Sequence, residues 1–351
     1  MTNMELCKKT YDHLEEVAPQ VSHYFGILAL FGGLKAAEAS GDKEFLQRMV
    51  DQLAKFPDQI DHLRLGKYTF KSYTCGGIAR AYALFKGYMT DDKTKELVRF
   101  YADELLYEAP KDRNGIVKSP FISPREVIWI DNAMAVTPFL LYAGLALNEP
   151  KYIDEAVAQT IKMYDVFLDE ETGLLHQTKG EIAAGVISDD FWGRGNGWGI
   201  IALTELVHYL PADYPTRWMV EEYFGRHCHA MLMCQDFHYV WHQEMNDFDS
   251  YEEATATGLV LYAFGVGIRL NYLNPAAFQE GFEEGVRAMT KRFLNEKFEI
   301  INVCPGCRTP GNGREKGMHY SYVNRHPVTD DLHGAGPLML TYSEAIKNGQ
   351  P

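Results

Sequence analysis

The chain has 351 residues, of which 46% are hydrophobic, and a formal net charge of −14 at pH 7. This charge argues against nucleic acid and anionic membranes as partners, so an anionic ligand needs locally placed arginine or lysine. No run reaches the roughly 18 apolar residues of a membrane span. The N-terminal residues also lack the apolar stretch of a signal peptide, so we expect a cytoplasmic protein.

Six cysteines are scattered through the chain, and without an export signal we expect them to be reduced. Cys304-Pro-Gly-Cys307 has the spacing of a redox or zinc motif. A zinc site needs two further ligands, for which His319, His326 and His333 are candidates. The alternative is a loop with buried thiols. We favour the loop and predict no cofactor.

Helical periodicity dominates the sequence, and the alternation typical of strands is nearly absent. Twelve helices are expected near residues 3–18, 24–39, 42–56, 75–88, 92–108, 131–147, 150–168, 195–210, 215–234, 252–270, 276–294 and 334–347. They alternate between helices that are apolar nearly all round, such as 131–147, and charged amphipathic ones, such as 42–56. Six inner helices paired with six outer ones predict an all-α fold, an (α/α)6 barrel or six-hairpin toroid.

The N-terminal helix is expected to pack outside the last inner helix and close the ring. No linker rich in Pro, Gly or Ser divides the chain, so we predict one domain over residues 1–351. An open α-solenoid is the alternative, but the inner helices are too continuously apolar for an exposed concave face.

Polar and aromatic residues gather in the segments that enter the inner helices. These segments contain Ser22-His23-Tyr24, Lys71-Ser72-Tyr73, Trp129-Ile130-Asp131-Asn132, Asp189 to Trp198, Tyr251-Glu252-Glu253 and Asp330-Asp331-Leu332-His333. Because inner helices of a toroid all begin at the same end, these segments should meet at one mouth. The opposite helix ends are plainer, so the chemistry is expected at this mouth.

Residues 188–198 combine two tryptophans, an arginine and two aspartates with three glycines. Flat indole rings stack on sugar faces, and an arginine can bind a carboxylate through two parallel hydrogen bonds. The segment therefore predicts a sugar-binding surface made by Trp192, Arg194 and Trp198. The alternative is a loop whose tryptophans belong to the core.

Asp131 is the strongest candidate for a catalytic acid, because Trp129, Ile130, Ala133 and Met134 surround it with apolar groups. Desolvation raises the pKa of a carboxyl group, whereas the N-terminus of a helix lowers it. The sequence leaves this balance open. A role as a simple helix cap is the alternative.

Several motifs, taken in order, resemble one enzyme family. They are Trp129-Ile130-Asp131, Ala135-Val136-Thr137-Pro138-Phe139-Leu140, Glu171-Thr172-Gly173-Leu174-Leu175-His176, Phe191-Trp192-Gly193-Arg194-Gly195-Asn196-Gly197-Trp198, Thr255-Ala256-Thr257-Gly258 and Asp331-Leu332-His333-Gly334-Ala335-Gly336. This set is similar to the unsaturated rhamnogalacturonyl hydrolases of glycoside hydrolase family 105, which are close to the unsaturated glucuronyl hydrolases of family 88. The resemblance runs from about residue 120 to 345 and implies an (α/α)6 barrel.

The resemblance also implies an unusual hydrolysis. The substrates carry a non-reducing-end uronic acid with a C4=C5 double bond, left by a lyase acting on pectin or rhamnogalacturonan. The residue that matches Asp131 protonates C4 and activates the water that adds at C5; the hemiketal then opens and releases the next sugar. The expected substrate contacts are Tyr73, Trp129, His176, Asp190, Trp192, Arg194, Trp198 and His333.

One departure from the family pattern concerns a second aspartate, which usually lies in the loop entering the second inner helix. Residues 68–84 contain no carboxylate; a lysine there, Lys71, would suit a more anionic ligand. The candidate replacements are Asp61, Asp189, Asp190, Glu252 and Asp331.

Three alternative functions stay open. One is an inverting glycosidase with two carboxylates about 6.5–9.5 Å apart, such as Asp131 with Asp190 or Glu252. The others are a non-catalytic sugar-binding protein and a zinc enzyme that uses Cys304 and Cys307. The second sugar, its linkage and the oligomeric state are not determined by the sequence.

Overall fold

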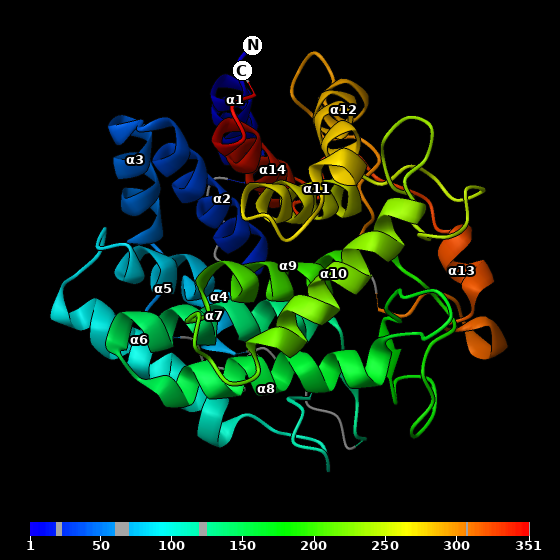
Figure 1. The fold of residues 1–351 in the computed structure, drawn as a ribbon, viewed down its shortest axis with the longest axis horizontal. Helices are drawn as coiled ribbons and strands as arrows, with labels where there is room; N and C mark the ends of the chain where they lie inside the picture. The colour runs from blue at the N-terminus through cyan, green and yellow to red at the C-terminus, as the bar shows by residue number, and fades with distance from the viewer. Residues whose placement is uncertain (19–22, 60–69, 119–124, 307, 351) are drawn as a thin grey trace.

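The computed structural model describes residues 1–18, 23–59, 70–118, 125–306 and 308–350. Within these residues, six inner helices form a ring that six outer helices cover (Figure 1). The inner helices are α2 (Tyr24–Ser40), α5 (Gly77–Phe85), α7 (Asp131–Leu147), α9 (Gly193–Tyr209), α11 (Ala254–Arg269) and α14 (Ala335–Lys347). The outer helices are α1 (Asn3–Val17), α3 (Lys43–Leu53), α6 (Asp92–Asp103), α8 (Pro150–Phe167), α10 (Arg217–Met233) and α12 (Pro275–Phe293).

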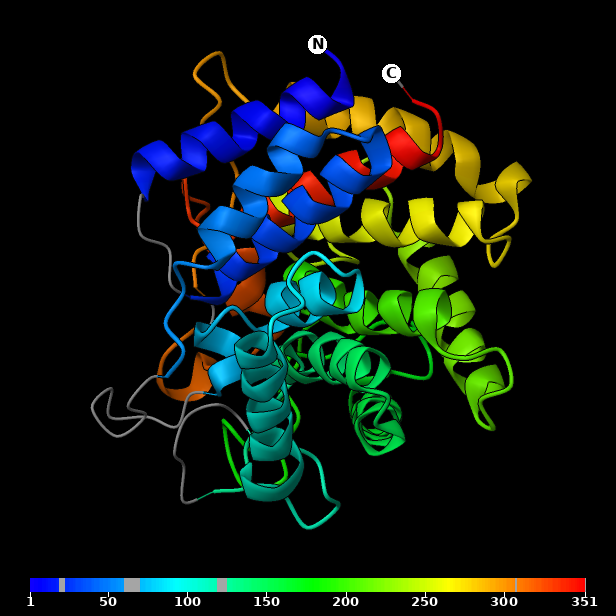
Figure 2. The same ribbon diagram turned by 90° about the vertical axis from the view of Figure 1, so that its left-hand side faces the viewer.

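The ring of inner helices is closed. Each inner helix packs against the next in chain order, and α14 packs against α2. Helix α1 lies along α14, so the two ends of the chain lie near each other at one side of the molecule (Figure 2). The (α/α)6 barrel predicted from the helix pattern is confirmed, including the position of the N-terminal helix.

The two kinds of helix differ in how many of their faces are buried. In α11 every residue from Ala254 to Ile268 is buried, whereas in α3 only Phe45, Met49 and Leu53 are. The spacing of four residues in α3 places its apolar side chains on one face. Small residues in the inner helices permit close approach: a Cβ atom on Gly258 would lie 2.8 Å from Pro337 of α14. The alternating composition therefore encodes the inner and outer layers directly.

A buried ion pair fills the centre of the ring. The Lys35 ammonium on α2 donates to the Glu205 carboxylate on α9 over 3.1 Å, and both side chains are fully buried. The hydroxyls of Tyr142 and Tyr262 also donate to Glu205. At about 1.5 Å per residue, this pair lies roughly 16 Å along its helices from their N-terminal ends. It therefore links α2 and α9 across the interior of the ring.

Local details differ from the helices expected from periodicity. The second inner helix is preceded by a separate turn, α4 (Lys71–Thr74), and α6 continues into a π-helical turn at Glu104–Glu108. Two short strands, β1 (Ile128–Trp129) and β2 (Thr178–Lys179), pair antiparallel. Two further short elements lie between α12 and α14: a 3-10 turn at Gly313–Glu315 and helix α13 (His319–Val323). Over the described residues, every helix is too short or too polar to cross a membrane.

Candidate active site

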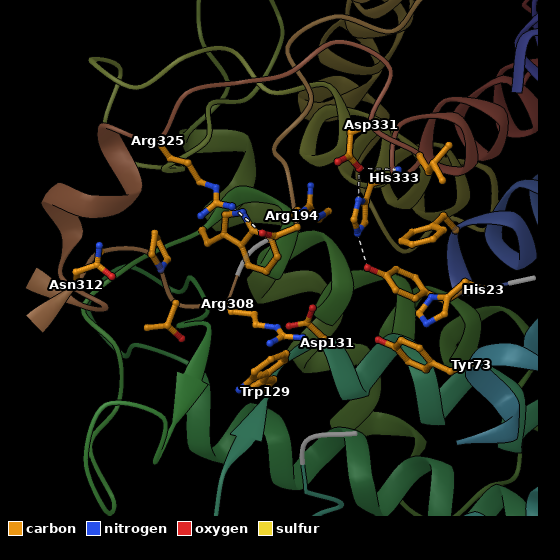
Figure 3. A pocket seen from close by; sticks show the side chains of 18 residues that line it. His23, Tyr73, Trp129, Asp131, Arg194, Arg308, Asn312, Arg325, Asp331 and His333 are labelled. Atoms are coloured by element: carbon orange, nitrogen blue, oxygen red, sulfur yellow. Dashed lines mark hydrogen bonds and ion pairs between the residues drawn. The ribbon is translucent and has the colours of Figure 1, made fainter. Parts of the chain in front are cut away.

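Five of the six segments that enter the inner helices line a cavity of about 700 Å³ (Figure 3), and the segment Tyr251-Glu252-Glu253 does not. This volume lies in the range typical of small-molecule sites. Six predicted site residues line the cavity: Tyr73, Trp129, Asp131, Trp192, Arg194 and His333. The lining also includes His23, Tyr24, Asp331 and Arg325, together with Gly306 and residues 308–312. Most of the polar and aromatic segments that were predicted to meet at one mouth of the barrel therefore do so.

Asp131 is the first residue of α7 and follows strand β1, whose pairing with β2 fixes the preceding backbone. Its Oδ2 atom is buried and has no hydrogen-bond partner among the described residues. Burial raises the pKa of Asp131 to about 6, against the opposing effect of Arg194. Helix α7 has no side-chain cap at this end. Asp131 is thus a carboxyl group that can exchange a proton near neutral pH.

Arg194 lies on the first turn of α9 and is 1% exposed. Its guanidinium donates to the backbone carbonyls of Cys304 and Pro305, the latter over 3.1 Å. The guanidinium also lies over the Trp192 ring, 4.8 Å from its centroid. Both terminal nitrogens of the guanidinium are thus engaged by backbone carbonyls. These contacts do not favour the sequence-based interpretation that Arg194 binds a carboxylate through two parallel hydrogen bonds. Arg194 anchors the segment that follows Val303 and supplies positive charge beside Asp131.

Aromatic rings form much of the cavity wall. Trp192 is 1% exposed, and its indole N–H has no hydrogen-bond partner among the residues that the structure describes. Tyr24 and Tyr73 lie with their ring centroids 4.7 Å apart, and His23 stacks on Phe25 at 5.0 Å. Such rings offer flat apolar faces, and the indole adds a buried donor. The wall fits a ligand with both apolar faces and hydroxyl groups.

His333 connects Asp331 to Tyr24 at the edge of the cavity. Its Nδ1 atom is hydrogen-bonded to the Asp331 carboxylate and its Nε2 atom to the Tyr24 hydroxyl (Figure 3). His333 is 7% exposed. The cavity thus holds two carboxyl groups with different surroundings: Asp131 faces open space, whereas Asp331 is already bonded to His333.

The family model for Glycosyl Hydrolase Family 88 matches residues 1–348. The chain belongs to glycosyl hydrolase family 88. It is therefore a glycoside hydrolase, and the family resemblance drawn from the motifs is confirmed.

Several named proteins are 22–25% identical to this chain over part of its length. The unsaturated rhamnogalacturonyl hydrolase YesR of Bacillus subtilis (strain 168) is 24% identical over 242 residues, 66% of this chain and 67% of that protein. An unsaturated 3S-rhamnoglycuronyl hydrolase of Formosa agariphila is 25% identical over 274 residues, 74% of this chain and 67% of that protein. A second protein of that name, from Alteromonas sp. (strain LOR), is 22% identical over 206 residues and matches over 57% of this chain and 46% of its own length.

Solved structures share the fold of this family 88 chain. A family 105 glycoside hydrolase of C. acetobutylicum ATCC 824 superposes with a TM-score of 0.80 at 21% identity, covering 96% of this chain and 98% of that chain. An unsaturated glucuronyl hydrolase of Bacillus sp. GL1 has a TM-score of 0.67 at 16% identity, covering 98% and 95%. At these identities, the likeness shows the fold alone.

Three predicted substrate contacts lie outside the cavity lining. Trp198 is one helical turn beyond Arg194 on α9, is 1% exposed and packs edge-on against Tyr24. The Nδ1–H of His176 donates to the Asp190 carbonyl over 2.9 Å, and its ring packs against Phe191. These side chains support the wall from behind instead of facing the ligand space. For Trp198, the core alternative describes its position.

Asp190 is also occupied by protein contacts. Its buried carboxylate accepts from the backbone N–H groups of Gln177 and Trp192, over 3.1 and 3.0 Å, and from the hydroxyl of Ser188. Burial raises the pKa of Asp190 despite these bonds. The carboxylate therefore fixes the chain that presents Trp192, and it does not line the cavity.

The other proposed second carboxylates differ in their surroundings. Glu252 is paired with Arg292 through two hydrogen bonds of 2.6 Å and with His238 over 2.7 Å, outside the cavity lining. Asp189 does not line the cavity, and Asp61 lies outside the described residues. Asp331 is the candidate that the fold brings to the cavity.

Lys71 does not face the cavity, contrary to the sequence-based suggestion that it serves a more anionic ligand. Its ammonium donates to the buried Glu104 carboxylate over 2.7 Å, and its backbone N–H donates to the same carboxylate over 3.0 Å. Glu104 opens the π-helical turn after α6. The lysine therefore secures the start of the second inner hairpin.

Two arginines of the cavity lining were missed by the sequence interpretation. Arg308 points toward Asp131 and Trp129, and Arg325 approaches from the opposite wall (Figure 3). Arg325 donates to the Gly306 carbonyl over 2.6 Å. Arg308 directly follows Cys304-Pro-Gly-Cys307, whose CxxC spacing drew attention to its thiols, and Arg325 lies further along the same connection between α12 and α14. The signal in the sequence that could have identified them is that they flank a stretch containing several glycines and a proline.

Several of the side chains that a zinc site at the Cys304-Pro-Gly-Cys307 motif would use have other contacts. Cys304 is buried and its thiol donates to the Pro305 carbonyl over 3.3 Å, and Cys307 lies outside the described residues. His319 is hydrogen-bonded to Glu244 and Asp247, and His333 to Asp331 and Tyr24. Of the described residues, Asp236, His238 and Glu252 come close enough together to hold an ion, but Arg292 already neutralises Glu252.

Proposed function

We propose that this family 88 enzyme removes a 4,5-unsaturated uronic acid from the non-reducing end of oligosaccharides made by a polysaccharide lyase, by hydrating the C4=C5 double bond. The relatives named unsaturated rhamnogalacturonyl and 3S-rhamnoglycuronyl hydrolases support this substrate class. A rhamnogalacturonan-type fragment is our first choice. We also propose that residues 1–351 act as one domain, since α1 packs on α14.

The main observation behind the proposal is that Asp131 has a buried carboxyl oxygen and a raised pKa. A buried carboxyl oxygen without a partner is costly unless a ligand or proton satisfies it. With its pKa near 6, part of the Asp131 population is protonated at neutral pH and can deliver a proton to C4. The carboxylate that remains can then take a proton from the water that adds at C5.

Positive charge around Asp131 supports binding of the uronate carboxylate. Arg194 is held rigidly by backbone carbonyls, so its charge contributes to the field of the cavity. Arg308, on the exposed side and pointing toward Asp131, is the side chain that we assign to direct contact with the substrate carboxylate (Figure 3). The faces of Trp129, Trp192 and Tyr73 would pack against the sugar rings.

The test is a panel of lyase-generated oligosaccharides of the rhamnogalacturonan and sulfated rhamnoglycuronan types. Hydration destroys the conjugated double bond, so turnover is followed by the loss of its ultraviolet absorbance. Matched saturated oligosaccharides serve as the control, and no sugar should be released from them. Release from the saturated substrates would instead support an ordinary glycosidase. Binding without turnover across the panel would support a non-catalytic sugar-binding protein.

A further inference from the structure

The hydrogen bonds of Tyr24, His333 and Asp331 form a chain with a defined direction. Tyr24 begins α2, and the other two residues lie in the segment before α14, so the chain joins the two inner helices that close the ring. Phe25 also packs edge-on against the His333 ring, with the ring centroids 4.8 Å apart. The His333 backbone N–H also donates to Asp331 over 3.1 Å. These contacts fix the imidazole plane.

The direction of the chain follows from the charge state of its members. Burial opposes ionisation of Asp331, but hydrogen bonds from His333 outweigh it and lower the pKa of this carboxyl group. Burial lowers the pKa of His333 to about 4, and Arg194 adds to this effect. Asp331 is therefore a carboxylate and His333 a neutral imidazole near pH 7. A carboxylate can only accept, so the single imidazole proton resides on Nδ1.

The Nε2 atom of His333 is then an acceptor, and the Tyr24 hydroxyl must donate to it. Burial raises the pKa of Tyr24 far above its ordinary range, so the phenol keeps its proton. That proton is committed to His333. Since Tyr24 lines the cavity, what its oxygen offers to a ligand is a lone pair.

We propose that Tyr24, oriented by His333 and Asp331, is a fixed hydrogen-bond acceptor in the cavity that recognises an O–H donor, either a hydroxyl of the bound sugar or the water that adds to it. An ether or a methylated hydroxyl cannot donate and is disfavoured at this position. Tyr24 touches the ligand, and His333 and Asp331 act through it as positioning residues. The identity of the ligand rests on the proposed function, but the direction of the chain does not.

Three variants test the acceptor: Tyr24→Phe, Asp331→Asn and the double variant. Tyr24→Phe removes the oxygen and keeps the ring, so kcat/KM should fall about 3- to 10-fold, as expected for one neutral hydrogen bond. Asp331→Asn lets the imidazole carry its proton on Nε2, which reverses the direction of the chain and should cost as much. Because the residues act as a unit, the double variant should lose little more than either single variant. A fall in kcat identifies the water, and a rise in KM at unchanged kcat identifies a sugar hydroxyl.

Tyr152→Phe is the matched control, because Tyr152 donates to Asp103 on the outer layer and should leave kinetics unchanged. Nitrogen-15 NMR of the wild-type enzyme gives an independent result: the Nε2 of His333 should be unprotonated at pH 7. A protonated Nε2, or single variants within about twofold of wild-type kcat/KM, would overturn the proposal. If the wild-type enzyme consumes no unsaturated substrate, the proposed function fails, and the NMR result alone decides the acceptor.

Discussion

Replacing Asp131 by asparagine should remove activity and increase stability at the same time. The folded-state pKa of Asp131 is about 6, against an ordinary value of 3.8. This difference corresponds to up to about 3 kcal/mol. The sign follows from linkage: between pH 4 and 6 the unfolded chain releases this proton while the folded chain keeps it, so the free energy of unfolding decreases as the pH rises. Above pH 6 the full cost is present.

Asparagine carries no such cost. At pH 7 the variant should therefore be more stable by up to about 3 kcal/mol, or about 4 °C in Tm for a chain of 351 residues. This gain in stability should disappear near pH 3.5, where Asp131 is largely protonated in both the folded and the unfolded chain. Turnover should fall by about 10²–10⁴-fold, since asparagine cannot deliver a proton. Thermal melts at both pH values and the ultraviolet assay measure these effects.

Asp42→Asn is the matched control with the opposite sign. Asp42 is bonded to Lys8 and to the Phe45 N–H, and its pKa is lowered mainly by the bond to Lys8, so neutralising it should not stabilise the fold at pH 7. The reasoning is refuted if Asp131→Asn melts at or below the wild-type temperature at pH 7. Near wild-type turnover in that variant would show that another group supplies the proton.

Three further predictions concern the acid, the arginine and the barrel centre. The kcat/KM of the wild-type enzyme should decrease tenfold per pH unit above about pH 6, because the protonated form of Asp131 is consumed; a flat profile from pH 5 to 8 would contradict this. Arg194→Lys should lower both Tm and turnover, with a loss of about 2 kcal/mol or more as hydrogen bonds to Cys304 and Pro305 disappear; a change in KM alone would restore the carboxylate-binding role. Lys35→Met should destabilise the fold by about 3–5 kcal/mol in denaturant unfolding, and adding Glu205→Gln should recover part of the loss; no loss in the single variant would show that Lys35 is not needed to balance Glu205.

The fold was predictable because its information is local. Whether a helix is apolar on all faces or on one can be counted within its own residues, and that property separates α11 from α3. The π-helical turn at Glu104–Glu108 was not predictable in this way. Glu104 is buried by its bonds to Lys71, a residue 33 positions earlier, and no local pattern marks such a partner.

The candidate site was predictable where residues begin inner helices, and less so elsewhere. Asp131 and Arg194 reach the cavity because each lies on the first turn of its helix. Trp198 lies one turn later on the same face as Arg194, which moves it about 5 Å deeper into the barrel. Whether a residue of this segment lines the cavity, as Arg194 does, or lies in the core, as Trp198 does, depends on where α9 starts. An error of two residues in the predicted start of the helix is enough to obscure this difference. Arg308 and Arg325 come from a long connection whose course the sequence does not specify.

The net charge of the whole chain and the charge of the cavity lead to different conclusions about the ligand. At physiological ionic strength, exposed charges are screened beyond about 8 Å, so most of the −14 charge does not act on a ligand inside the cavity. There, Arg194, Arg308 and Arg325 outnumber the carboxylates Asp131 and Asp331, and Asp131 is partly neutral near its pKa of about 6. The local field therefore favours an anion in an acidic protein. A bound uronate would in turn raise the pKa of Asp131 further, which keeps the acid protonated when the substrate is present.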